Sequence, residues 1–594
     1  MKFDLFCERV REILSEELPE GRDVVAAGRG IARDIELGLS SFCRAKGVAS
    51  ELEYKRRCMR EGRIMYHCHI GMSSWKDTAA ALRELYRYTT SAGYVQDRAG
   101  ICLDRRMALP GGMRSSAPAE TGPMLEDVSD WMAVASTVPI QPHMGDFMIG
   151  FPSSTENTAY ALQAGVTTVG NLSQFFSHEA PLWKDKAYTA VETVKAIALM
   201  GAFRERGTLV HSYLDDGFGA LFFDCATIAG WALLEKYIVE DLLGAKLAHC
   251  MGGLISDPIK RSGWVFALDE IHDGDCVGSM FFGDTISFTK NFDLNRALVA
   301  EYLMWDIMTQ LACPTGHAVL PMPVTEAVRV PTLEEIIEAQ TFARRIEPAA
   351  RRMLPHFDFS APKAFARKVV DEGRSVFRKA LEGLSECGVD VRDPVRLLYV
   401  LKRLGPAAFE QMFGAGPAEP TQPRGRTSIV PNDVFERSRE LVEANRQHFA
   451  DERLLEALSG KRVLLASTDV HEHALYVIGN LLRETPATVI DTGAERNADE
   501  VAADALSAGA DMVFVSTHNG MALEYAHMLL EEMEERGLGT PIVMGGVLNQ
   551  KVDEDAVPVD VTVELQKMGI LTAADMKALS GLICERKAPA RCRL

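Results

Sequence analysis

Asp469 and His471 stand two residues apart in the segment STDVHEHAL, where an apolar run typical of a strand changes into a pattern typical of a helix. A carboxylate that hydrogen-bonds one nitrogen of an imidazole fixes the tautomer of the ring and raises its basicity. The pair therefore suggests an imidazole oriented for chemistry at the mouth of a β-α turn. A plainer interpretation also stays open, in which Asp469 is an N-cap and His471 begins an ordinary helix.

A second set of polar side chains lies earlier in the chain, at the ends of eight short apolar segments. These segments are RIMYHCH, GICLDR, VPIQPH, GVTTVGN, GTLVHSY, KLAHC, GSMFFGD and PTGHAVLP. Their polar residues are His67, His69, Asp104, Arg105, His143, Asn171, His211, His249, Asp284 and His317. The further candidates nearby are Arg106, Asp215, Asp216 and Glu326. The C-terminal ends of parallel strands form one face of a barrel, so we expect these side chains to share a site.

The histidines of this set allow three interpretations. His67 and His69 alternate along one strand and point to the same side of it. Together with His211 and His249 they resemble the metal set of the amidohydrolase barrels, although the segment PTGHAV lacks the aspartate of that pattern. Hydrogen bonding to a polar or anionic substrate, a bound divalent metal and packing in the barrel interior all stay open.

The elements that would position both sets divide the chain into five parts. Residues 1–60 have a helical pattern, and residues 61–330 alternate short strands with helices, which predicts a (β/α)8 barrel of the TIM type. Residues 331–413 are expected as a helical extension and residues 414–431, rich in Pro and Gly, as a linker. In residues 432–594, strands alternate with helices again, which predicts a doubly wound, Rossmann-like α/β domain.

Composition limits the class of protein. The 594 residues carry a formal net charge of −19, which argues against nucleic acid as a main partner. No apolar stretch is long enough to cross a bilayer, and the N-terminus lacks the apolar core of a signal peptide. Twelve cysteines without a tight framework are typical of reduced thiols. We therefore expect a cytoplasmic protein with a small-molecule substrate.

Four further features follow the Asp469 and His471 pair in order along the C-terminal part. They are the segment VIDTG with Asp491 and Gly493, the helical run NADEVAADAL, the segment VFVST with Ser516 and Thr517, and the segment IVMGGV with Gly545 and Gly546. With the D-x-H-x-x-A pattern, this series resembles the cobalamin-binding domain of B12-dependent mutases and methyltransferases, over roughly residues 460–570.

The resemblance implies roles for these residues. His471 would be the lower axial ligand of cobalt and Asp469 its hydrogen-bond partner, with His473 as the alternative ligand. The other cofactor-binding residues would be Ala474, Asp491, Gly493, Ser516, Thr517, Gly545 and Gly546. Small residues suit a slot in which the nucleotide tail of cobalamin approaches the backbone closely. Two features depart from the family pattern: Ala474 replaces a glycine, and KMGILTAADM lacks a Gly-Pro-rich turn.

A barrel joined to a cobalamin domain resembles the adenosylcobalamin-dependent carbon-skeleton mutases. The segments AGVTTVGNLSQFF and LVHSYLDDGFGALFFD are most similar to the glutamate (methylaspartate) mutase large-subunit family. The resemblance implies a radical isomerase that holds a small polar or carboxylate-bearing substrate between barrel and corrin, in a chain expected to form a homodimer.

The expected roles of the barrel residues follow from this interpretation. The catalytic candidates are His69, His143, Asn171, His211, Asp215, His249 and His317. The substrate-binding candidates are His67, Arg105, Arg106, Asp216, Asp284 and Glu326. A methylcobalamin-dependent methyltransferase, a metal-dependent barrel enzyme with a B12-binding domain and a non-catalytic B12 sensor are the alternatives.

Overall fold

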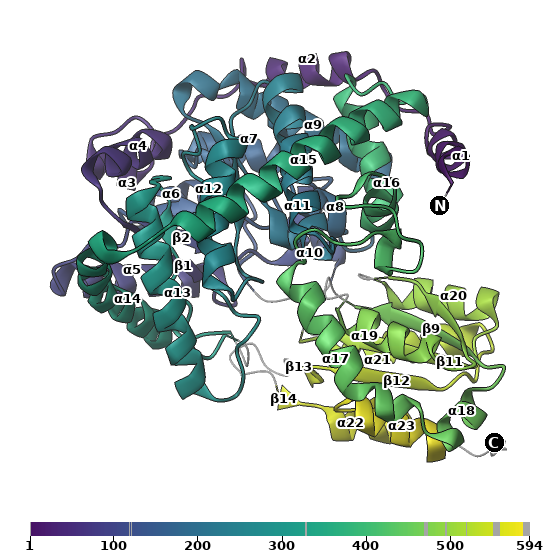
Figure 1. Ribbon diagram of the computed structural model, residues 1–594. Coiled ribbons are helices and arrows are strands. Elements are labelled where there is room, and N and C mark those ends of the chain that lie inside the picture. The colour runs from purple at the N-terminus through teal and green to yellow at the C-terminus, as the bar shows by residue number, and fades with distance from the viewer. Residues whose placement is uncertain are drawn as a thin grey trace. The chain divides into compact units, whose positions relative to one another are not determined.

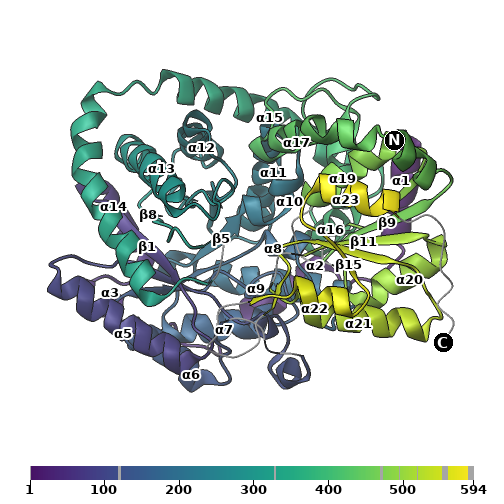
Figure 2. The same ribbon diagram turned by 90° about the horizontal axis from the view of Figure 1, so that it is seen from below.

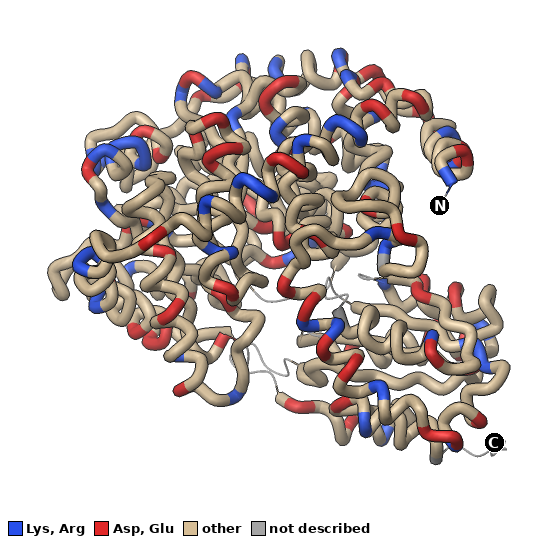
Figure 3. The backbone as a smooth tube through the Cα atoms, viewed as in Figure 1, with Lys and Arg blue, Asp and Glu red and all other residues tan. Residues whose placement is uncertain are grey.

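A computed structural model of the chain describes residues 2–117, 119, 122–326, 330–468, 473–493, 496–517, 520–550 and 559–585. The chain forms two compact units, Met1–Asp433 and Val434–Leu594 (Figure 1). In the described parts of both units, no helix is long and apolar enough to span a bilayer. Acidic and basic residues are interspersed along the helices of each unit (Figure 3).

Unit 1 begins with four helices and continues with eight parallel strands. The helices are α1 (Phe3–Ile13), α2 (Gly21–Ile31), α3 (Ser41–Lys46) and α4 (Glu51–Glu61). The strands are β1 (Met65–Ile70), β2 (Arg98–Ile101), β3 (Gln141–His143), β4 (Thr168–Val169), β5 (Leu209–Tyr213), β6 (Leu247–Met251), β7 (Met280–Phe281) and β8 (Ala318–Val319). Each of the eight apolar segments picked out in the sequence contains or adjoins one of these strands.

The strands of unit 1 form two four-stranded sheets. One has the order β3-β2-β1-β8 and the other β4-β5-β6-β7. A parallel bridge joins Met144 to Val169, and the amide of Gly278 donates to the carbonyl of Thr315 over 2.7 Å. In the described residues the α/β class with parallel sheets is thus confirmed, whereas a closed eight-stranded barrel is not shown.

Helices follow the strands and bury their apolar faces against them. They are α5 (Trp75–Ser91), α6 (Val128–Ser136), α7 (Ser154–Ala164), α8 (Gln174–Ser177), α9 (Lys186–Ala202), α10 (Phe218–Leu221), α11 (Cys225–Lys236), α12 (Pro258–Ile271) and α13 (Phe292–Ala312). Figure 2 shows α5, α6, α13 and α14 outside β1 and β8. Side-chain caps define several helix starts: Asp127, Asp224 and Asp257 accept hydrogen bonds from first-turn amides. Trp131 in α6, Trp231 in α11 and Trp264 in α12 are fully buried.

Residues 331–433 belong to unit 1. They include α14 (Leu333–Met353), α15 (Ser360–Glu386) and α16 (Pro394–Phe413). The segment 414–431, expected as a linker, is held against unit 1. Asp224 Oδ2 accepts hydrogen bonds from Ser428, Ile429 and Val430, and Arg426 donates to four backbone carbonyls. Composition alone does not reveal the contacts with Asp224, because this residue lies about 200 positions earlier.

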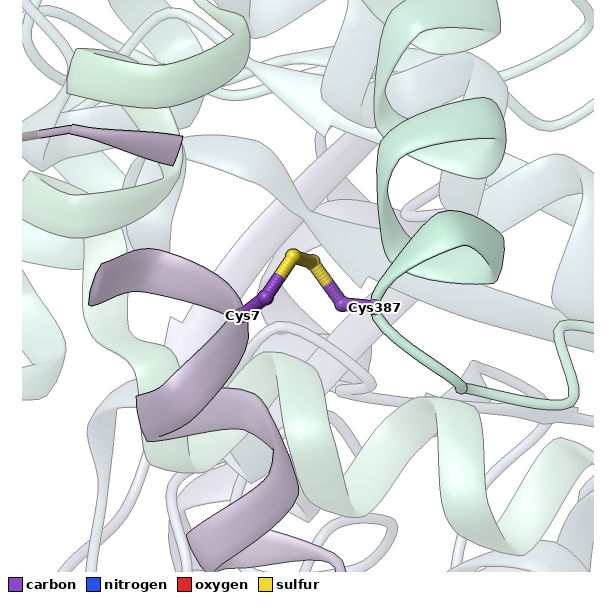
Figure 4. Close-up of a disulfide and its surroundings, with 2 residues drawn as sticks. All are labelled: Cys7 and Cys387. Atoms are coloured by element: carbon purple, nitrogen blue, oxygen red, sulfur yellow. A yellow bond between two sulfur atoms is a disulfide. The ribbon is translucent and has the colours of Figure 1, made fainter. Parts of the chain in front are cut away.

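The expectation of reduced thiols throughout is wrong for one pair of cysteines. Cys7 in α1 and Cys387, which follows α15, form a disulfide with 4.7 Å between their Cα atoms (Figure 4). The two residues are 380 positions apart, so their spacing could not show that the fold brings them together. Nine other cysteines lie in the part of the chain that the structure describes.

Unit 2 is a five-stranded parallel sheet between two layers of helices. Its helices are α17 (Asp433–Phe449), α18 (Glu452–Leu458), α19 (His473–Arg483), α20 (Ala498–Ala508), α21 (Ala522–Glu535), α22 (Thr562–Lys567) and α23 (Met576–Glu585). Its strands are β9 (Arg462–Ser467), β10 (Thr488–Asp491), β11 (Met512–Thr517), β12 (Ile542–Gly546) and β15 (Leu571–Ala573), beside a short hairpin of β13 (Asn549–Gln550) and β14 (Val559–Asp560).

The strand order of this sheet is β10-β9-β11-β12-β15. The chain therefore turns back between β9 and β11, which makes the doubly wound prediction correct. Side chains of β9 alternate between the two faces: Leu464 and Ala466 pack with α20 and α21, and Val463 and Leu465 pack with α19 and α23. Figure 2 shows these helices on opposite sides of the strands.

Candidate functional site

Small residues line up across the carboxyl edge of the unit 2 sheet. Ser467 pairs with Ser516, Ser516 pairs with Gly545, and Gly545 pairs with Ala573, so the row crosses four neighbouring strands. In open α/β sheets, ligands bind at the carboxyl ends of the strands beside the point where the strand order reverses. This row begins at that point, between β9 and β11.

Two members of the row favour a ligand that lies close to the backbone. Ser516 is 5% exposed, and its hydroxyl has no hydrogen-bond partner among the described residues. A buried hydroxyl is costly unless it is hydrogen-bonded, so this one suits a ligand with a polar group. A Cβ atom on Gly545 would lie 3.2 Å from the carbonyl oxygen of Ala573, so a larger residue would narrow this space.

The remaining residues of the expected C-terminal site lie around this edge. Thr517 is buried at the end of β11, and Gly546 has a φ of 99°, which favours glycine. Asp491 is exposed at the end of β10, and its Oδ1 accepts a hydrogen bond from the amide of Gly493 over 3.2 Å. Ala474 is half-buried in the first turn of α19. Asp469 and His471 lie outside the described residues, as does the side chain of His473.

Unit 1 brings five of the expected histidines together, and we call them the histidine group: His67, His69, His143, His211 and His317. Their ring centroids are 5.0 Å apart for His67 and His69, 5.1 Å for His143 and His211, and 5.3 Å for His211 and His317. His69 is partly exposed, whereas the other four are at most 2% exposed. Gly100 gives these rings room, since a Cβ there would lie 2.9 Å from the ring of His69.

Hydrogen bonds determine the tautomer of His143. Its Nδ1 lies 3.3 Å from the carbonyl oxygen of Thr168, which can only accept, so Nδ1 carries the hydrogen. Nε2 is then an acceptor, and the hydroxyl of Tyr213 donates to it. Tyr213 therefore adds to the site a phenol oxygen whose hydrogen is already engaged.

Burial keeps the histidine group neutral. Burial, followed by the charge of Arg98, holds the pKa of His67, His143 and His211 well below the usual value. Burial and Arg98 also lower the pKa of His69 to about 4. At neutral pH the rings are therefore uncharged. Among the described residues, no group of three or more His, Cys, Asp or Glu side chains is arranged to hold a metal ion.

Three charged residues lie beside the histidine group. Glu51 and Lys55 from α4 and Arg98 from β2 are completely buried, and Glu51 Oε1 contacts both Lys55 Nζ and Arg98 Nε. Burial by itself would raise the pKa of Glu51, but the charges of Arg98 and Lys55 bring it below its usual value. Burial lowers the pKa of Lys55 to about 8, so this amine is charged at neutral pH. Two cations and one carboxylate leave one net positive charge here.

Carboxyl groups gather at the ends of β3 and β5. Asp216 accepts a hydrogen bond from Asn171 Nδ2 over 2.8 Å, and Asp215 Oδ2 accepts from the amides of Gly252 and Gly253 over 2.8 and 2.7 Å. Burial, and then the charges of Asp215 and Asp146, hold the pKa of Asp216 well above its usual value. Burial raises the pKa of Asp146 to about 6. Asp146 can therefore hold or release a proton near pH 6.

His249 does not join the histidine group. Its Nδ1 lies 2.9 Å from His272 Nε2, and its Nε2 lies 3.2 Å from Glu235 Oε2. The neighbouring residues of β6, Ala248 and Cys250, point the other way: Cys250 Sγ lies 3.7 Å from His211 Nδ1. Because side chains alternate along a strand, His249 faces α11, which carries Glu235, and points away from the face of the sheet that holds the histidine group.

The remaining expected side chains are engaged locally. Arg106 is paired with Asp104 over 2.8 Å, and Arg105 donates to the carbonyl of Glu179. Asp284 accepts hydrogen bonds from Ser256 and from the amide of Ile286. Burial raises the pKa of Glu326 to about 7. Both arginines thus have partners within the protein.

Comparisons with known proteins bear on unit 2. Residues 462–572 match the family model described as the B12 binding domain. The chain is also 35% identical over 101 residues to the 2-hydroxyisobutanoyl-CoA mutase small subunit of Aquincola tertiaricarbonis, a match that covers 16% of this chain and 72% of that protein. The chain belongs to the B12-binding family. The B12-binding domain is unit 2, and its row of small residues fits the cofactor that the family name implies.

Sequence reasoning missed Tyr213 and Arg98 in unit 1. Tyr213 lies two residues after His211 on the same strand, so the period of two along a strand could have revealed it. Arg98 is the first residue of β2, so it is not found among the polar residues at the C-terminal ends of the strands. Glu51 and Lys55 come from a helix before the first strand, and their role depends on where α4 packs.

Proposed function

We propose that this protein is an adenosylcobalamin-dependent isomerase that acts on a small polar or carboxylate-bearing substrate. The single observation that carries the proposal is the histidine group, five imidazoles gathered at one place in a chain that also has a B12-binding domain. The similarity to a mutase small subunit also supports an isomerase, although it covers the B12-binding domain alone.

We also propose that the two sheets of unit 1 close into a (β/α)8 barrel. The bridge between Met144 and Val169 supports contact between β3 and β4. The hydrogen bonds from Gly278 N to Thr315 O, 2.7 Å, and from Thr315 Oγ1 to Ser279 O, 2.5 Å, support contact between the segments that lead into β7 and β8. Such a barrel would present the histidine group to its interior.

In the B12-binding domain, Ser516, Thr517, Gly545 and Gly546 would hold cobalamin, and His471 and Asp469 remain the proposed ligand pair. When bound, adenosylcobalamin supplies radical chemistry. The residues of unit 1 would bind the substrate, orient it and exclude water. Neutral imidazoles suit this task because each offers one hydrogen-bond donor and one acceptor without adding a charge. Tyr213 and His143 would orient a polar group of the substrate.

Absorption and paramagnetic resonance spectra of the full chain test the proposal. The protein is loaded with adenosylcobalamin or with methylcobalamin, and spectra are recorded with and without light and with a panel of small carboxylic acids. A radical signal that depends on adenosylcobalamin and on one of the acids is expected. Methyl transfer from methylcobalamin, with no such signal, would overturn the proposal in favour of a methyltransferase. The homodimer and the cytoplasmic location stay predictions.

A further inference from the structure

His317 carries a hydrogen-bond donor that lacks an acceptor. Its Nε2 lies 3.2 Å from Arg98 Nη1. A guanidinium can only donate, so Nε2 must accept and the ring hydrogen must be on Nδ1. His317 Nδ1 is buried and has no partner among the described residues. The contact with Arg98 thus leaves an N–H group of His317 available.

Arg98 and His67 provide two more such donors. Arg98 Nη2 is buried without a partner in the described parts of the chain, and so are both ring nitrogens of His67. Whichever tautomer His67 adopts, one of its nitrogens carries a hydrogen. A buried donor without an acceptor destabilises the fold, because it has lost its hydrogen bonds to water and gained none in return. A group of three is therefore unusual unless something accepts from them.

The three donors come from adjacent positions in the fold. Arg98 and His67 are register partners on β2 and β1, and β8, which follows His317 directly, pairs with β1 on its other side. The ring centroids of His67 and His317 are 6.3 Å apart. A small group placed among these side chains could therefore meet all three donors.

The charge of the surroundings favours a negative group. Glu51 is shared between Lys55 and Arg98, which leaves one net positive charge among three completely buried side chains. Burial is the main reason that the pKa of His67 and His317 is low, and the positive charges of Arg98 and Lys55 lower it further, so these rings lie in a positive field. A cation would be repelled here, whereas a carboxylate would be attracted and could accept several hydrogen bonds.

We propose that Arg98, His67 and His317 form a binding site for a carboxylate group of the substrate. The site deepens the proposed function and rests on it, because it names the substrate class that the histidine group holds. A carboxylate has two oxygens that can accept from the guanidinium and from both imidazoles. The carboxylate would bind on the buried side of the histidine group, farther from solvent than the partly exposed His69.

Isothermal titration of the full chain with succinate tests this site, with succinamide as the neutral analogue and putrescine as the cationic one. Ionic strength and pH are held constant. We expect succinate to bind at least about tenfold more tightly than succinamide, because hydrogen bonds to charged groups are about twice as strong as neutral ones. Putrescine should not bind. Equal binding of succinate and succinamide, or no binding of succinate, would overturn the proposal.

Three variants locate the binding. His67→Phe and His317→Phe keep an aromatic ring and remove the donors, so each should weaken succinate binding about tenfold or more. His356→Phe is the matched control, because this histidine is exposed and lies outside the histidine group, so the substitution should leave the affinity unchanged. Circular dichroism shows which variants fold. If one phenylalanine variant fails to fold, the other still decides, and unchanged affinity in a folded variant contradicts the site.

Two further measurements separate this site from other outcomes. Inorganic phosphate is titrated in parallel, and tighter binding of phosphate than of succinate would assign the donors to a free oxyanion and overturn the substrate carboxylate. Cobalamin binding is followed separately by absorbance. Succinate binding without any adenosylcobalamin-dependent radical would mean that the proposed function fails while the carboxylate site stands. A radical without succinate binding would mean the reverse.

Discussion

Two groups of buried histidines on neighbouring strands of unit 1 differ in how their ring nitrogens are engaged. His249 and His272 lie behind β6, and both nitrogens of His249 have partners, Glu235 and His272. In the histidine group, both nitrogens of His67 lack partners in the described structure, as does one nitrogen of His211 and one of His317. The contacts of His249 stabilise the fold without need of a ligand, although the Nδ1 of His272 also lacks a partner in the described structure. The histidine group leaves hydrogen-bonding capacity that a ligand can use.

The largest expected effect would come from breaking the contacts of His249. His249→Ala leaves the Oε2 atom of Glu235 and the Nε2 atom of His272 buried without their partner, so we expect the free energy of unfolding to fall by about 3 kcal/mol. Urea denaturation followed by tryptophan fluorescence measures this, since Trp231 donates to Glu235 over 2.8 Å. His67→Phe is the comparison and should cost less, because it removes nitrogens that had no partner. Equal destabilisation by the two substitutions would contradict the distinction.

A second prediction concerns turnover. His143→Phe removes the acceptor of the Tyr213 hydroxyl, and we expect turnover of the true substrate to fall about a hundredfold or more, the usual contribution of a positioned polar group. Cobalamin affinity should stay unchanged, because the cofactor residues lie in the other unit. The Tyr213→Phe variant should lose activity to a similar extent if the pair acts together. Normal turnover in both variants would show that the histidine group is structural.

The third prediction moves the comparison to the B12-binding domain. Gly545→Val adds a branched side chain where even a Cβ atom would lie 3.2 Å from the carbonyl oxygen of Ala573. We expect the dissociation constant for cobalamin to rise about tenfold or more, since the slot would narrow. Ser516→Ala, which removes one unpartnered hydroxyl, should raise it about fivefold or less. A spectral titration measures both, and unchanged affinity in Gly545→Val would place the cofactor elsewhere.

The smallest effect concerns pH and the carboxyl group of Asp146. Burial raises its pKa from about 4 to about 6, so the folded protein binds this proton more tightly than the unfolded chain does. Its contribution to stability is therefore lost as the pH rises from about 4 to 6 and stays lost above that. The free energy of unfolding of Asp146→Asn, relative to that of the wild type, should rise by about 1 kcal/mol when the pH is raised from 4 to 7; this figure allows for the partial exposure of the side chain. Urea midpoints of both proteins at the two pH values measure this difference. A fall in the relative stability of the variant as the pH rises would contradict a raised pKa.

Much of the fold follows from local patterns in the chain. The eight apolar segments of unit 1 and the alternating strands of the C-terminal part appear where they were expected, because the period of two along a strand and the polar breaks between segments are properties of neighbouring residues. The row of Ser516, Gly545 and their neighbours was likewise predictable, since small residues at strand ends are visible in the sequence.

The tertiary structure decided which polar residues meet. His211 and His249 have similar positions near strand ends in the sequence, yet they point to opposite faces of the sheet. The pairing of β5 with β6 places His211 beside Ala248, and His249, the next residue, therefore points to the other face. The disulfide of Cys7 with Cys387 and the burial of Glu51 beside Arg98 join residues distant in the chain. Such contacts depend on how helices and strands pack, and local sequence carries no information about the partner.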